Sequence, residues 1–304
     1  MQFADYVASR ALHITSDCLR LLSGPAVEDG VLTTAAAANL LRSVGRLASL
    51  WQLEQWCVGK AEYRRAITRI REAEQVLRAG EASFDAVASQ LLARADDVKA
   101  RRAVERARSA FARPNSGSQA VDPAVLNRLF QDESAVWRAQ GSNVCTRDAD
   151  LVEYGIGRAF IKSRRAVEML MAKPASSKRL RRAHRWVGHI AHHLELLQPA
   201  LSEENEARAW FIGRLEANLT RRMDLARFVA VAETLPLKRR QRKRIAQLSR
   251  RLDRRLIEQS GKLVNGAYRG GRKKALRALA RDVERMGLDE IALLPVAGGA
   301  EAAT

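Results

Sequence analysis

Apolar residues recur at intervals of three and four along most of the chain, the spacing that places them on one face of an α-helix. No segment stands out for the alternation of apolar and polar residues that is typical of β-strands. The pattern therefore predicts an all-α protein. The expected helices span residues 3–22, 32–57, 61–79, 81–111, 123–139, 151–172, 176–198, 202–235, 240–265 and 271–287.

Two pairs of segments in opposite halves of the chain resemble each other. Residues 44–53 align with residues 187–196 at an offset of 143 positions and share Val, Gly, Ala and the last Leu. Phe-Asp-Ala-Val at 84–87 and Met-Asp-Leu-Ala at 223–226 follow in the same order. Two such matches indicate a duplicated helical unit. We therefore expect two four-helix-type bundles of long antiparallel helices, related by pseudo-twofold symmetry.

The expected duplication also divides the chain. Hydrophobic residues make up 47% of it, which is enough for a sizeable core. A segment rich in Pro, Ser, Gly and Asn at 113–119 is typical of a linker. We expect a first bundle repeat at 1–120, a connector helix and loop at 121–149, a second, strongly basic repeat at 150–290 and a disordered tail at 291–304.

Positive charge is concentrated in the second half of the chain. Residues 1–150 contain 20 Lys and Arg against 18 Asp and Glu, whereas residues 151–304 contain 33 against 16, within a net charge of +19. This excess is larger than solubility needs and indicates a polyanionic partner. Nucleic acid, an anionic membrane and an inorganic phosphate polymer all fit, and a solvated cationic face is the alternative.

Four of the five histidines lie in the segment 183–201. Arg182, Arg185, His189 and His192 are spaced at i, i+3, i+7 and i+10, so they share one stripe of a helix. A row of cations on adjacent turns suits an anion with repeating charges better than a single small substrate. At the 143-residue offset, the equivalent positions of the first half are occupied by Asn39, Arg42, Arg46 and Ser49.

A metal site is the other interpretation of the histidines. His189 and His193 are four residues apart, as in helical zinc pairs. The glutamate of the HExxH motif is missing, and we expect the nearest acid, Glu195, to lie on another side of the helix. We therefore expect no metal and no cofactor, and we expect His193 to occupy a contact between helices.

Further basic residues lie on neighbouring predicted helices. Arg158, Lys162 and Arg165 share one face, and Arg222 lies on a later helix. Like charges held together are unfavourable without a bound anion, so converging helices of this kind would form an anion-binding groove. The residues expected to bind the anion are Arg42, Arg46, Arg158, Lys162, Arg165, Arg182, Arg185, His189, His192 and Arg222.

The densest basic segment is 238–255, which contains ten Lys and Arg and one acid. Ile245, Leu248, Leu252 and Leu256 give it a narrow apolar stripe, which predicts a docked helix with a cationic outer face. The outer face is either solvated, a contact for nucleic acid, or an outer extension of the polyanion site.

No catalytic or compartment signal accompanies these patterns. The glycine-rich phosphate loops, the GxSxG elbow and Cys/His nucleophile arrangements are absent, so we expect no enzyme. Cys18, Cys57 and Cys145 form no metal-ligand spacing and indicate no disulfide framework, which favours a reducing cytosol. With no signal peptide visible and no apolar run near the roughly 20 residues of a transmembrane helix, we expect a soluble, cytoplasmic protein.

The chain resembles the CHAD family, the conserved histidine α-helical domain proteins, over roughly residues 5–288. The family's His-x-x-Arg-x-x-x-Arg/Lys-x-x-Arg pattern is matched by Asn39, Arg42, Arg46 and Ser49, and again by Arg182, Arg185, His189 and His192. The segments at 154–166 and 261–269 also resemble family segments, and Asp85 and Asp224 match its motif aspartates. The resemblance implies two four-helix bundles related by a pseudo-twofold axis, with a basic central channel that binds inorganic polyphosphate.

The preferred hypothesis is a non-enzymatic protein that binds polyphosphate in a basic groove. Its histidines are expected to become protonated when an anion binds, so binding is expected to strengthen below about pH 6.5. Nucleic-acid binding through 238–255 is one alternative. The chain departs from the family at Asn39, Phe84 and Met223, where the family has basic or histidine residues. The second alternative is therefore a scaffold or storage-granule-associated protein with a degenerate ligand site.

Overall fold

The computed structural model describes residues 3–24, 27–28, 31–79, 82–111, 122–140, 148, 151–172 and 176–285. It is all-α, as predicted, apart from two short antiparallel strands, β1 (Val27–Glu28) and β2 (Val31–Leu32). The linker expected at 113–119 and the tail expected at 291–304 lie outside the described residues. Within them, no helix is both long and apolar enough to cross a membrane.

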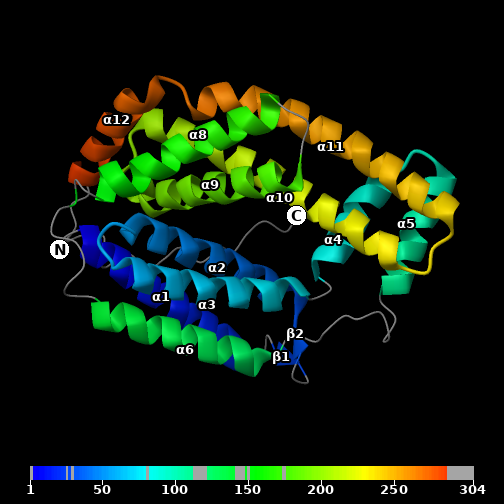
Figure 1. Cartoon of the computed structure of the whole chain (residues 1–304), viewed down its shortest axis with the longest axis horizontal. Coiled ribbons are helices and arrows are strands. Elements are labelled where there is room, and N and C mark those ends of the chain that lie inside the picture. Colours follow the sequence, from blue (N-terminus) through cyan, green and yellow to red (C-terminus); the bar gives the residue numbers. More distant parts are fainter. Residues whose placement is uncertain are drawn as a thin grey trace.

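The first set of helices contains α1 (Phe3–Ser23), α2 (Thr34–Glu54), α3 (Lys60–Ala79) and α6 (Pro123–Gln140), which pack side by side (Figure 1). Their shared core holds a buried carboxylate, Glu133, which accepts hydrogen bonds from the indoles of Trp51 and Trp137 and from Arg69. These bonds connect α2, α3 and α6. The segment expected as a connector therefore supplies a helix that packs within this set.

The second set contains α8 (Gly157–Ala172), α9 (Ser177–Leu196), α10 (Glu203–Thr234), α11 (Arg239–Ala267) and α12 (Gly271–Arg285). A π-helical turn, η1 (Leu151–Ile156), precedes α8, and a 3-10 turn, η2 (Gln198–Ala200), follows α9. Gly270 and Gly271 both have positive φ angles, which permit the sharp turn between α11 and α12.

The N-terminus of α10 is capped by another helix. Buried Asp282 of α12 accepts hydrogen bonds from the backbone N–H and hydroxyl of Ser202 and from the amide of Asn205. A carboxylate at this position satisfies backbone donors and interacts favourably with the helix dipole. The acid that caps the helix therefore lies about 80 residues away from it in sequence.

The single helix expected at 81–111 is divided into α4 (Ala82–Ala93) and α5 (Val98–Phe111). The division occurs at Asp97, whose carboxylate accepts the backbone N–H of Lys99 and so favours a new helix start. The α4–α5 hairpin packs against residues 225–256 of α10 and α11 around a separate apolar core. We call α4, α5 and residues 225–256 the distal unit, which lies at the right of Figure 1.

The two main sets meet mainly through α2 and α9. A second close contact, where η1 packs on α2, depends on the missing side chain of Gly155. A Cβ atom at Gly155 would lie 2.8 Å from the backbone oxygen of Leu53, which leaves no room for a side chain. The pseudo-twofold relation between the two sets stays a prediction, as does the division of the chain into repeats.

The cysteines differ from the sequence expectation. Cys57 is disulfide-bonded, and Cys18 is free and buried. The partner of Cys57 therefore lies outside the described residues. Spacing along the sequence did not predict this bond, because pairing depends on which cysteines the fold brings together.

Candidate functional site

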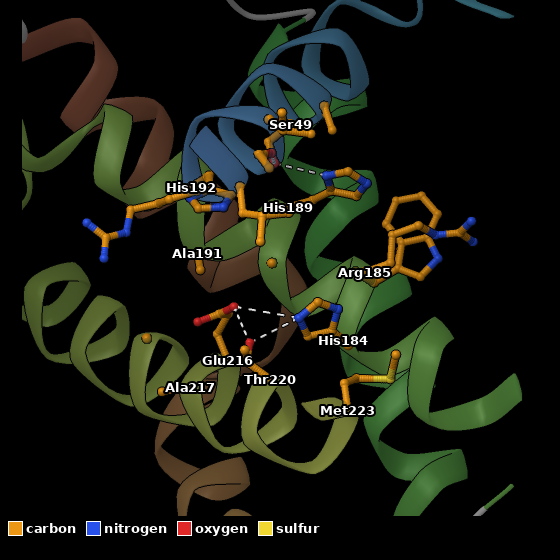
Figure 2. Close-up of a pocket in the computed structure, with 18 of the residues that line it drawn as sticks. Ser49, His184, Arg185, His189, Ala191, His192, Glu216, Ala217, Thr220 and Met223 are labelled. Atoms are coloured by element: carbon orange, nitrogen blue, oxygen red, sulfur yellow. Dashed lines mark hydrogen bonds and ion pairs between the residues drawn. The ribbon is translucent and has the colours of Figure 1, made fainter. Parts of the chain in front are cut away.

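A groove of about 1800 Å³ runs between α2, α3 and α4 on one side and α9 and α10 on the other. Nine Lys and Arg, three His and five Asp and Glu line it, so its walls carry a net positive charge. Helix α9 contributes the largest basic share, which includes Arg185, His184, His189 and His192. Figure 2 shows His189 directed at Ser49 of α2 and His184 directed at Glu216 and Thr220 of α10. The cationic stripe predicted from the sequence therefore lines a real concavity.

Six of the ten predicted anion-binding residues line the groove, and four do not. Arg46 is drawn into an ion pair with Glu195. The guanidinium of Arg158 lies over the ring of Trp56 instead, at 5.2 Å from its centroid. The residues that line the groove are Arg42, Lys162, Arg182, Arg185, His189 and His192.

The other two residues outside the groove lie on the second helical set. Arg165 is exposed on α8. Arg222 is only 1% exposed and forms a 2.7 Å ion pair with Asp253 of α11. Helical spacing gave the face of each residue but not the neighbour that this face meets.

The four predicted Arg and Lys residues that line the groove carry charge that no acid compensates. Arg42, Lys162, Arg182 and Arg185 form no ion pair with any described residue. Burial, together with the positive charges of Arg71 and Arg182, lowers the pKa of Arg185 from its usual value. Like charges crowded in this way are relieved by a bound anion.

The contact between α2 and α9 is made by small residues and histidines. The Ser49 hydroxyl donates to the carbonyl of Gly45 at 2.8 Å, and its oxygen lies 3.0 Å from Nδ1 of His189. Because the single hydroxyl proton is already used, His189 is the donor to Ser49. His193 is fully buried and donates from Nε2 to the Ser49 carbonyl at 2.8 Å. Both rings therefore fasten α9 to α2.

These two histidines are uncharged at neutral pH. Burial is the main cause that lowers the pKa of His189 well below its usual value, with smaller effects from His193 and His192. Burial also lowers the pKa of His193 to about 4, against the opposing hydrogen bond to Ser49. The sequence interpretation gave His189 the role of a cation, because an arginine stands at the equivalent position of the first half. Burial keeps the ring uncharged at neutral pH here, so that interpretation stays a prediction for the anion-bound protein.

Glu195 also lines the groove, beside His192 on α9. Its carboxylate accepts hydrogen bonds from Arg46 and from His192, whose Nδ1 lies 3.2 Å away. Burial alone would raise the pKa of Glu195, but the hydrogen bonds and charges of His192 and Arg46 outweigh it and hold the pKa at about 2. Glu195 follows His192 by almost one helical turn and so shares its side of α9, away from the pair His189 and His193 to which the sequence expectation referred.

A second polar cluster joins α9 to α10. Thr220 donates to Glu216 at 2.8 Å, and Nε2 of His184 lies 3.0 Å from the Thr220 hydroxyl (Figure 2). Burial lowers the pKa of His184, although the Glu216 carboxylate opposes the shift. Sequence reasoning missed Thr220 and Glu216, because no motif surrounds them and only the packing of α10 on α9 brings them to His184.

The groove presents more cations than acids to a ligand. Among the described residues, no group of three His, Cys, Asp or Glu side chains is arranged to hold a metal ion. Three of its five acids are engaged: Glu195 with Arg46, Glu216 with Thr220, and Glu74 with Arg78. The uncompensated cations are therefore the groups that a ligand would meet.

Comparisons with known proteins do not identify the chain. No protein-family model, curated protein or solved structure matches it. The resemblance to the CHAD family stays an expectation drawn from the sequence. Function is therefore inferred from the groove and from the distribution of charge.

Proposed function

We propose that the protein is a non-enzymatic receptor for inorganic polyphosphate, which binds in the groove between α2–α3 and α9–α10. The observation that carries this proposal is the set of uncompensated cations that line one concavity: Arg42, Lys162, Arg182 and Arg185. Arginine keeps its charge at any physiological pH and forms bidentate, charge-assisted hydrogen bonds with phosphate oxygens.

A chain of phosphates fits these cations better than a single phosphate does. Lys178, Arg181, Arg182 and Arg185 line the groove from successive turns of α9, which are about 5.4 Å apart. Lys162 on α8 and Arg42 on α2 extend the cationic lining to other helices. Only a ligand with repeating charges meets several of these groups at once. The similarity to the CHAD family supports the same ligand.

The histidines have a positioning role in this proposal. His189 and His193 hold α9 against Ser49 of α2 and so set the width of the groove. With its pKa far below the usual value, His189 stays neutral where an unperturbed histidine starts to gain a proton, near pH 6.5. The strengthening of binding that the sequence predicted below about pH 6.5 is therefore expected to require a more acidic solution.

The test is a calorimetric titration of the protein with long-chain polyphosphate at near-physiological salt. Replacing Arg42, Arg182 and Arg185 with alanine removes three exposed cations and is expected to weaken binding about 100-fold, because each lost charge-assisted bond contributes at least about 1 kcal/mol. The matched control replaces Arg64, Arg65 and Arg128, three exposed arginines on α3 and α6, with alanine. Equal weakening in both variants would show that only total charge matters and would overturn the proposal.

One observation favours a second candidate, a helical scaffold with a degenerate ligand site. Phe84 stands where the related family has a basic or histidine residue, and its ring stacks against Phe111 and Phe228 with centroids 4.1 and 4.3 Å away. The position serves an apolar core instead of a ligand. This candidate predicts no measurable binding of polyphosphate or any other polyanion at physiological salt, so the same titration separates the two.

A further inference from the structure

A second block of uncompensated positive charge lies outside the groove, on α11. Seven basic side chains between residues 239 and 255 are exposed and have no ion pair or hydrogen bond with any described residue. The one acid of the segment 238–255, Asp253, is already paired with buried Arg222 of α10. These seven residues are Arg239, Arg240, Lys243, Arg250, Arg251, Arg254 and Arg255.

Four of these cations form a continuous row. Arg240, Lys243, Arg250 and Arg254 are spaced at i, i+3, i+10 and i+14, which keeps them on one face of the helix. At about 1.5 Å per residue, the row is about 21 Å long. The opposite face holds Ile245, Leu248 and Leu252, which are buried in the core of the distal unit. The row is therefore carried on a packed helix and its direction is fixed.

The neighbouring helix α5 enlarges the basic surface. It packs against α11 within the distal unit, as Figure 1 shows. Lys99, Arg101, Arg102 and Arg106 of α5 are exposed and make no ion pair with a described residue. Exposed cations on two packed helices suit a wide ligand whose charges are spread over its outside.

The side chains around the row discriminate between classes of polyanion. Membrane binding by a helix requires apolar side chains that enter the lipid, yet the exposed face of α11 is charged or polar throughout the row. Single-stranded nucleic acid is held by exposed aromatic rings. Among the large apolar side chains exposed on the described residues, only Val98 belongs to the distal unit. Both classes therefore lack their usual contacts here.

We propose that this surface of α11 and α5 binds the phosphate backbone of double-stranded nucleic acid without reading its sequence. Lysine and arginine contacts to phosphates give affinity and position, whereas sequence reading needs contacts to base edges. The surface is independent of the polyphosphate groove, because no residue of α11 or α5 lines that groove. Either proposal therefore stands if the other fails.

The test measures fluorescence anisotropy of a labelled, mixed-sequence duplex of about 20 base pairs over a salt series. The variant carries Arg240→Glu, Lys243→Glu, Arg250→Glu and Arg254→Glu. Loss of four phosphate contacts is expected to reduce the slope of log affinity against log salt by about 3 to 4. At about 100 mM salt this corresponds to affinity weaker by about 100-fold or more.

Two further variants control for charge and folding. Reversal of Arg64, Arg65, Arg128 and Arg138 changes net charge equally on the outer faces of α3 and α6, and is expected to leave most of the affinity intact. Changing the three arginines of the row to lysine keeps the charge and is expected to retain affinity within about threefold. Equal loss in the α3–α6 variant, or loss in the lysine variant, overturns the proposal.

Two further measurements test whether the duplex binds in the groove instead and whether the α11 surface binds membranes instead. The alanine variant at Arg42, Arg182 and Arg185 is expected to bind the duplex as the unmodified protein does. If that variant loses the duplex while the α11 reversal keeps it, the duplex uses the groove and the proposal is wrong. Binding to phosphatidylserine vesicles that depends on the α11 row, without binding to the duplex, would assign the surface to membranes and would also overturn it.

Discussion

At the scale of single residues, the environment of a carboxyl group decides its charge. Glu54 near the end of α2 is only 2% exposed, one of its oxygens has no hydrogen-bond partner, and burial raises its pKa to about 7. Glu195 lies on the facing helix set, where Arg46 and His192 outweigh burial and hold its pKa at about 2. Two glutamates of the same interface region therefore respond to pH in different ranges.

Replacement of Glu54 with glutamine is expected to stabilise the protein at high pH only. Because the folded-state pKa of Glu54 is raised from 4.5 to about 7, the favourable contribution of its neutral form is present below pH 4.5 and is lost as the pH rises through about 7. The variant removes this loss, so its free energy of unfolding should exceed that of the unmodified protein by about 2–3 kcal/mol at about pH 8.

Urea unfolding at about pH 8 and about pH 5 measures the effect, and the gain should be much smaller at the lower pH. The exposed Glu105 provides the control, since Glu105→Gln removes the same charge without a buried site. An equal gain at both pH values would show that Glu54 is not the titrating group.

Sequence spacing identified which residues of the groove share a stripe, but not their protonation. Arg42, Arg182 and Arg185 could be predicted because arginine stays charged wherever it lies. His189 could not, because its neutrality depends on burial against α2 and on the Ser49 hydroxyl. Glu216 reaches the site only through the packing of α10 on α9, which leaves no trace in the order of residues.

At the scale of helices, periodicity predicted the elements well and their partners poorly. The helix expected at 202–235 is observed as Glu203–Thr234, and the all-α class is confirmed. The hydrophobic stripe of a helix states which face is buried, but not against which helix. The α4–α5 hairpin therefore packs on the second helical set, although it belongs to the first half of the chain.

The pair of Arg222 and Asp253 between α10 and α11 is expected to be stabilising only as a pair. Asp253→Ala leaves the 1% exposed guanidinium of Arg222 without its acid, which should cost about 3 kcal/mol of unfolding free energy. The double variant Arg222→Met with Asp253→Leu removes both charges and fills the same space, so it should recover most of that loss.

Chemical denaturation of the two variants, and of Arg222→Met and Asp253→Leu alone, completes the cycle. If Asp253→Ala and the double variant are equally unstable, the loss of stability does not come from an uncompensated charge on Arg222. Arg222 was predicted as an anion-binding residue, and the cycle would show instead that its charge serves the contact between helices.

At the scale of the whole molecule, two separate surfaces concentrate positive charge in a protein whose net charge is +19. The groove places cations around a concavity between the helical sets, and α11 presents them on its exposed outer face. The two shapes suit different polyanions, because a thin flexible chain enters a groove and a wide rod rests against an outer surface. The sequence predicted both basic stripes but could not predict that they face different directions.

Binding of polyphosphate in the groove is expected to raise the melting temperature through mass action. A ligand that binds only the folded state stabilises it by about 2.7 kcal/mol at a concentration 100 times its dissociation constant. For a chain of this size, that is a rise of about 5 °C. The rise should shrink in the alanine variant at Arg42, Arg182 and Arg185 and persist in the α11 charge-reversal variant. Orthophosphate at the same phosphorus concentration should have little effect, since one phosphate meets few of the spaced cations; an equal rise would mean that general screening of charge stabilises the fold.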